Sequence, residues 1–156
     1  MVCEVTQTAT RILCLGNALH GDDGLGEAVF EAMQRRPLPD AVSLVRVPFV
    51  GVDTLPSIEG CGRLLIVDAL EGFGAPGSIH VLRPDDIAEE TSDASHGEGL
   101  GCWLARLPAW LEAMPDIEVI GVEAAHIRAF SPGLSAAVGA SVDAVCQQLM
   151  ERTAHG

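Results

Sequence analysis

The feature of this sequence that most constrains its fold lies near its start. There an apolar run is followed by a glycine-rich loop and then by an amphipathic stretch. Residues 11–16 form a short run that is typical of a strand buried on both faces. Residues 16–26 are rich in glycine, and from Leu25 and Val29 apolar side chains recur at helical spacing to about Arg36. A strand, a loop and a helix in this order form the unit from which parallel α/β sheets are built.

The same alternation continues to the end of the chain. Further strands are expected over 43–47, 64–68, 77–82 and 117–122, and helices over 53–59, 100–114 (kinked at Pro108) and 134–149. The run 77–82 follows its predecessor too closely for a parallel crossover, so we expect it to be antiparallel or at an edge. The pattern predicts a single three-layer α/β domain over 1–156, with a mostly parallel five-stranded sheet flanked by helices.

The charge balance disfavours several kinds of partner. The net charge is −13, and all nine basic residues are arginine. Such a surface repels phosphate backbones and anionic lipids, so nucleic acid and membranes are not expected partners. A metal centre or a basic partner fits better, although the charge could serve solubility alone. The chain has no run of 18 apolar residues and no signal-peptide pattern at its start, which favours the cytoplasm.

Three residues with metal-binding side chains fall where a parallel sheet would bring them together. Asp23 follows the first strand, Asp68 ends the apolar run 64–67, and His96 lies in a polar loop before a helix. Ligand sites in such sheets lie outside the carboxyl ends of the strands. Two carboxylates and one imidazole leave open positions on a divalent metal. Taken singly, each residue also suits an ordinary loop, and only their shared edge favours a site.

Other catalytic signatures are absent or weak. The spacing Gly21-x-x-Gly24-x-Gly26 reverses the dinucleotide fingerprint, and the true G-x-G-x-x-G at 72–77 precedes a strand and is interpreted as a turn. The chain has no Walker lysine, no G-x-S-x-G and no H-E-x-x-H. A nucleophilic pair of Cys102 with His96 is conceivable, but Cys102 adjoins an apolar helical stripe that favours packing. The five cysteines are scattered and form no C-x-x-C, so we expect them to be packed thiols.

Several motifs in order carry a family resemblance. They are Leu15-Gly16-Asn17-x-Leu19-x-Gly21-Asp22-Asp23-Gly24-x-Gly26, Ile66-Val67-Asp68-Ala69 with Pro76-Gly77, Ser95-His96-Gly97, Ile120-Gly121-Val122-Glu123 and Gly133-Leu134-Ser135. With them the chain resembles the maturation endopeptidases of nickel–iron hydrogenases. The resemblance implies a twisted sheet flanked by helices, and an enzyme that removes a C-terminal extension from the hydrogenase large-subunit precursor. It also implies that Asp23, Asp68 and His96 bind the nickel held by that precursor. Some relatives have glutamate at the position of Asp23.

We therefore expect a cytoplasmic, monomeric, aspartic-type endopeptidase whose nickel comes with the substrate precursor. Asp23, Asp68 and His96 would serve both as metal ligands and as catalytic residues. The attacking water could be activated by the metal or by a carboxylate. One alternative is a non-catalytic nickel-binding or precursor-holding chaperone on the same fold. Another is a small-molecule enzyme that uses Mg²⁺, which fits poorly with a histidine ligand.

The neighbouring acids Asp22 and Asp23 are expected to differ in role. Asp22 is placed to cap the helix that begins near Leu25, so we expect it to be structural. Asp23 lies one residue further and is expected to face the metal. On this interpretation Asp22→Asn keeps the cap and the activity, whereas Asp23→Asn folds but is inactive.

Overall fold

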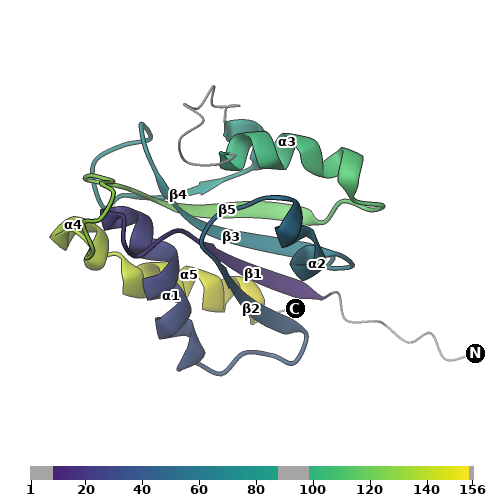
Figure 1. Ribbon diagram of the computed structural model, residues 1–156. Coiled ribbons are helices and arrows are strands. Elements are labelled where there is room, and N and C mark those ends of the chain that lie inside the picture. Colours follow the sequence, from purple (N-terminus) through teal and green to yellow (C-terminus); the bar gives the residue numbers. More distant parts are fainter. Residues whose placement is uncertain (1–8, 88–98, 155–156) are drawn as a thin grey trace, which may run out of the picture.

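A five-stranded sheet forms the centre of the computed structural model, which describes residues 9–87 and 99–154. The strand order is β2-β1-β3-β5-β4 (Figure 1). The four parallel strands are β1 (Thr10–Leu15), β2 (Val42–Val47), β3 (Arg63–Leu70) and β5 (Asp116–Glu123). The fifth, β4 (Ile79–Leu82), pairs antiparallel with β5 at the sheet edge. The expected mostly parallel sheet with an antiparallel edge strand is confirmed.

Helices cover both faces of the sheet and make three layers (Figure 1). On one face lie α1 (Leu25–Gln34), α4 (Ala136–Gly139) and α5 (Val142–Thr153); on the other lie α2 (Leu55–Ile58) and α3 (Leu100–Trp110). The described residues also form three 3₁₀ turns: η1 (Gly21–Gly24), η2 (Val52–Thr54) and η3 (Pro84–Asp86).

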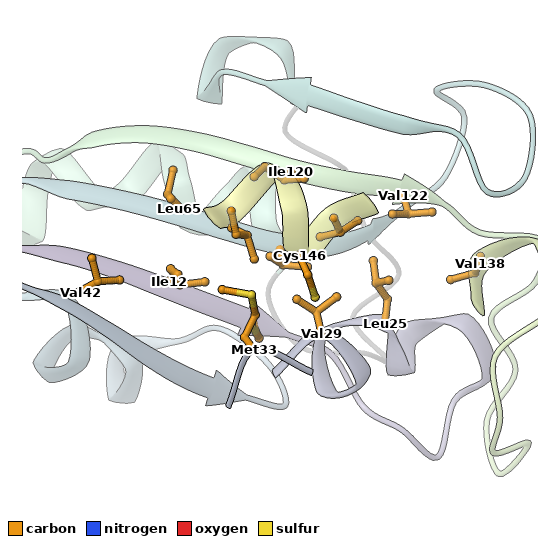
Figure 2. Close-up of a cluster of buried hydrophobic side chains, with 14 residues drawn as sticks. Ile12, Leu25, Val29, Met33, Val42, Leu65, Ile120, Val122, Val138 and Cys146 are labelled. Carbon is orange, nitrogen blue, oxygen red and sulfur yellow. The ribbon is translucent and has the colours of Figure 1, made fainter. Parts of the chain in front are cut away.

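Each buried strand divides its side chains between two cores. In β1, Ile12 packs with α1 and α5, whereas Leu13 packs with α3 on the other face. Figure 2 shows the first core, in which Met33 of α1 and Cys146 of α5 meet above the sheet. This alternation explains why the sequence of β1 is apolar throughout, because both of its faces are covered. Among the described residues, no helix is long and apolar enough to cross a membrane.

Two expected helices differ from those observed. The helix expected over 134–149 is broken into α4 and α5 by a turn at residues 140–141, where the N–H (3.0 Å) and the hydroxyl (2.6 Å) of Ser141 both donate to the carbonyl of Val138. The apolar spacing continues across this break, so periodicity did not reveal it. The helix expected over 100–114 ends at Trp110, two residues after Pro108.

The strand order creates a crevice between β1 and β3. From β1 the chain crosses to β2 on one side, and it then returns through α2 to β3 on the other side of β1. In open α/β sheets, ligands bind at such a reversal, outside the carboxyl ends of the strands. The register pairs Cys14 with Val67, so Leu15 at the end of β1 lies beside Asp68 of β3.

The contact between α1 and β1 can be tested at Gly26. A Cβ on Gly26 would lie 2.0 Å from the carbonyl oxygen of Leu15, so the helix packs closer to the strand than any side chain permits. Alanine normally favours a helix over glycine by about 1 kcal/mol. Here we expect the opposite sign: Gly26→Ala should lower the melting temperature. In the control Gly139→Ala, the nearest atom lies 4.0 Å away, and stability should be unchanged or higher. Equal effects of the two substitutions on thermal unfolding would contradict this packing.

Candidate active site

A cleft of about 820 Å³ opens at the crevice between β1 and β3. Asp23, from the loop after β1, and Asp68, from β3, both line it and are both half-buried. His20 and Glu71 line it as well, although the sequence pattern had not singled them out. The structure therefore brings two of the three predicted site residues to one cleft.

The loop after β1 positions Asp23 by folding back on itself. Gly16 takes φ +131°, and a Cβ there would lie 1.9 Å from the backbone carbonyl oxygen of Asp23. Only glycine fits this turn. The backbone N–H of Asn17 then donates to Oδ2 of Asp23 (2.9 Å), while Oδ1 of Asn17 accepts from the N–H of Leu19 (2.9 Å). These contacts fix the orientation of the Asp23 carboxylate.

Asp68 is held by the sheet itself. It pairs with Gly121 of β5, and its Oδ1 accepts from the N–H of Ala69 (2.9 Å). Strand alternation places its side chain on the same face as Ile66, which is the face covered by α3. A carboxylate on a central strand is thus carried by the most rigid part of the fold.

The third predicted residue, His96, lies outside the described residues. Ile87 and Gly99, the described residues on either side of that segment, both line the cleft. Within residues 9–87 and 99–154, no group of three His, Cys, Asp or Glu side chains is arranged to hold a metal ion. The metal role of the three residues remains a prediction.

Asp22 is structural, but not as the expected helix cap. Helix α1 begins at Leu25 with Gly24 at its N-cap, and the buried Asp22 side chain instead joins two distant segments. Its Oδ2 accepts from the N–H groups of Ala125 (2.8 Å) and His126 (3.2 Å) and from the hydroxyl of Ser135 (2.9 Å). Its Oδ1 accepts from the N–H of Ser135 (2.7 Å). The carboxylate therefore ties the loop after β1 to the segment after β5.

These hydrogen bonds decide the charge state of Asp22. Burial by itself would raise the pKa of the carboxyl, but donors from Ser135, Ala125 and His126 outweigh it and lower the pKa below the ordinary value of 3.8. Because the folded state binds the ionised carboxylate of Asp22 more favourably than water does, Asp22 stabilises the fold at pH values above its unfolded-state pKa. That contribution is lost as the pH falls through the folded-state pKa.

Glu123 at the end of β5 has a similar structural role that the sequence did not reveal. It is buried, and its carboxylate accepts from the N–H groups of Gly72 (2.7 Å) and Phe73 (3.0 Å). The G-x-G-x-x-G run is thus a loop between β3 and β4, as expected from its place before a strand. Glu123 holds this loop where Phe73 lines the cleft.

The described thiols act as packed side chains. Cys14 and Cys146 are fully buried in one core, and Cys61 is buried in the other. Burial raises the pKa of Cys14 to about 12 and also raises the pKa of Cys61 and Cys146, which keeps these thiols neutral. Cys102 lies in α3 and is half-buried. Its suggested pairing with His96 falls outside the described residues.

The structure is an α/β domain with two carboxylates in a cleft at the switch point of its sheet, the usual place for a ligand site in such folds. Residues 28–152 match the hydrogenase maturation protease family, so the chain belongs to that family and is an endopeptidase. The match begins after Asp23 and includes Asp68 and the position of His96. The Hydrogenase 3 maturation protease of Escherichia coli K12 is 29% identical over 143 residues, covering 88% of this chain and 86% of that protein.

Other relatives and solved structures agree. A putative hydrogenase maturation protease of Methanocaldococcus jannaschii is 28% identical over 138 residues, covering 85% of this chain and 88% of that protein. The solved hydrogenase maturating endopeptidase HybD from E. coli superposes with a TM-score of 0.79 at 24% identity, covering 93% and 91% of the two chains. A crystal structure of the Hydrogenase 3 maturation protease gives a TM-score of 0.70 at 26% identity, covering 91% and 89%. The expected fold and enzyme class are confirmed.

The contacts of Asp22 predict the effect of Asp22→Asn on stability. Asparagine offers one acceptor oxygen and turns an NH₂ group toward backbone donors, so N–H groups are left unsatisfied in a buried site. We expect the free energy of unfolding to fall by roughly 2–4 kcal/mol at neutral pH. This corrects the expectation from sequence that Asp22→Asn is nearly neutral.

The pH dependence provides the internal check. As the pH falls below about 4, wild type should lose the contribution of Asp22, so its stability should approach that of Asp22→Asn. Urea unfolding of both proteins across this range measures the effect, with the exposed Asp53→Asn as control. A constant difference between wild type and Asp22→Asn down to about pH 2 would show that folding does not lower the pKa of Asp22.

Proposed function

We propose that this endopeptidase removes a C-terminal extension from a nickel-loaded hydrogenase large-subunit precursor and recognises the nickel directly. The observation that supports this most is the presence of Asp23 and Asp68 in one cleft at the switch point of the sheet. His96 completes the proposed set. It lies three residues before Gly99, which lines the same cleft, and three extended residues span at most about 10 Å.

This set of donors suits an ion that arrives partly coordinated. Imidazole is a ligand that suits nickel, and a set of one imidazole and two carboxylates leaves other coordination positions for thiolates of the precursor. The protease ligands would then complete the coordination sphere only when the precursor is loaded. Cleavage would in this way depend on nickel insertion.

Hydrolysis also requires an activated water at the scissile carbonyl. Polarisation by the metal or proton removal by a carboxylate supplies that activation. In both cases Asp23 and Asp68 stand at the reacting centre, and the water delivers its oxygen to the acyl carbon and a proton to the leaving amine.

We further propose that the enzyme acts in the cytoplasm as a monomer. We do not expect it to bind nucleic acid, because its net charge of −13 disfavours such a partner.

Processing of precursor tests this function. Purified wild type should shorten nickel-loaded precursor, detected by intact mass, and should leave nickel-free precursor and casein uncut. Asp23→Asn and Asp68→Asn should each lose at least about 100-fold in rate, about 2.7 kcal/mol of transition-state stabilisation. Asn at position 23 keeps an oxygen that can accept from Asn17, so the fold should survive. Cleavage of nickel-free precursor at the wild-type rate would contradict nickel recognition. Binding without cleavage would favour a chaperone.

Metal binding by the isolated chain gives a second test. Calorimetry should show one weak site that prefers Ni²⁺ or Zn²⁺ to Mg²⁺, because the set includes an imidazole. His96→Ala and Asp68→Asn should weaken the site, whereas the exposed Asp53→Asn should not. Equal Ni²⁺ affinity in wild type and His96→Ala would remove His96 from the proposed ligands.

A further inference from the structure

Exposed apolar side chains gather at the edge of the sheet that holds the cleft. Among the described residues, seven large apolar side chains are exposed, and five of them follow the carboxyl ends of β1, β2 and β5. The remaining two, Val81 and Met114, lie on the edge strand and before β5. We call the five the apolar rim: Leu19 (54% exposed), Phe49 (68%), Val52 (63%), Ile127 (37%) and Phe130 (86%).

The apolar rim is continuous with the cleft. Phe49 and Ile127 line the cleft together with Asp23 and Asp68. The loops that carry Leu19 and Phe130 are joined, because the N–H of Ser131 donates to the carbonyl of Leu19 (2.8 Å). The rim therefore comes from three loops that are far apart in sequence, and each of these loops contributes residues that line the cleft.

Phe130 has an unfavourable backbone as well as an exposed ring. Its φ of 56° is in the left-handed region, and it is the one non-glycine residue with positive φ in the described part of the chain. Its ring is 86% exposed and meets the ring of His20 edge-on, with 6.2 Å between centroids. Glycine would suit this backbone better. A strained residue whose ring packs so little is of more use to a partner than to the fold.

We propose that the apolar rim is the docking surface for the polypeptide substrate, with Phe130 as its main anchor. This inference rests on the proposed function, since it takes the large-subunit precursor as the occupant. A folded substrate must cover the cleft mouth while its scissile segment enters, and the rim is the exposed apolar surface carried by loops that line this mouth. A second copy of the chain seated there would block the cleft of an endopeptidase. Aromatic and apolar anchors around a central site are typical of protein interfaces.

Phe130→Gly separates docking from folding. It removes the ring and also relieves the strain of the positive φ. We therefore expect a melting temperature equal to or above that of wild type but weaker binding of precursor. Nickel-free precursor is the probe for binding by interferometry, because it reports the rim without the metal contact. We expect at least a 10-fold rise in Kd for Phe130→Gly and a smaller rise for Phe49→Ser. The matched control Met114→Ser removes an exposed apolar side chain outside the rim and should leave Kd unchanged.

Cleavage of nickel-loaded precursor gives the second reading. Phe130→Gly should raise KM while kcat stays within about twofold, since Phe130 is not among the residues that line the cleft. If wild type fails to cleave but Phe130→Gly still weakens binding, the proposed function fails and the docking surface stands. Equal Kd values for wild type and Phe130→Gly would overturn the docking inference, and so would a failure of wild type to bind precursor. A melting temperature of Phe130→Gly below that of wild type would overturn it too. It is also overturned if sedimentation shows a wild-type dimer that this substitution dissociates.

Discussion

The buried carboxylate of Asp22 is the side-chain interaction that joins two of the segments lining the cleft, the loop after β1 and the segment after β5. It accepts four hydrogen bonds from Ala125, His126 and Ser135, which lie more than 100 residues further along the chain. The loop after β1 that contains Asp22 continues into Asp23, and the segment after β5 that donates to Asp22 also carries Phe130. A buried charge is tolerated because every one of these donors points at it. Without it, the loop with the proposed metal ligand and the loop with the proposed docking anchor would lose these four hydrogen bonds and keep backbone contacts such as that from Ser131 to Leu19.

The topology of the sheet supplies the other half of the arrangement. The reversal of strand order at β1 opens a crevice in which a residue after one strand meets a residue on the next. Gly16 lets the chain fold back so that Asp23 lies there, and Asp68 arrives on a rigid central strand. A strand thus places Asp68, whereas loops place Asp23 and the apolar rim.

Local patterns predicted the layers but not the long-range contacts. The apolar runs and helical spacings predicted the strands, the edge position of 77–82 and the presence of Asp23 and Asp68 at one edge of the sheet, because those depend on periodicity and topology. Asp22 was predicted to be structural for the wrong reason: a helix cap is a local motif, whereas its real partners are remote. Ser135 belongs to a motif quoted in the family resemblance, but nothing local connects it to Asp22. The break between α4 and α5 depends on a side-chain hydroxyl bond that apolar spacing does not record.

The central claim is that Asp23 and Asp68 bind the same metal ion. Anomalous diffraction from crystals soaked in Ni²⁺ locates such an ion without reference to cleavage. The account predicts one principal peak in the cleft, within about 2.0–2.6 Å of a carboxylate oxygen from each residue, as in ordinary metal–oxygen bonds. A principal peak bound by only one of the two, or by neither, would contradict it.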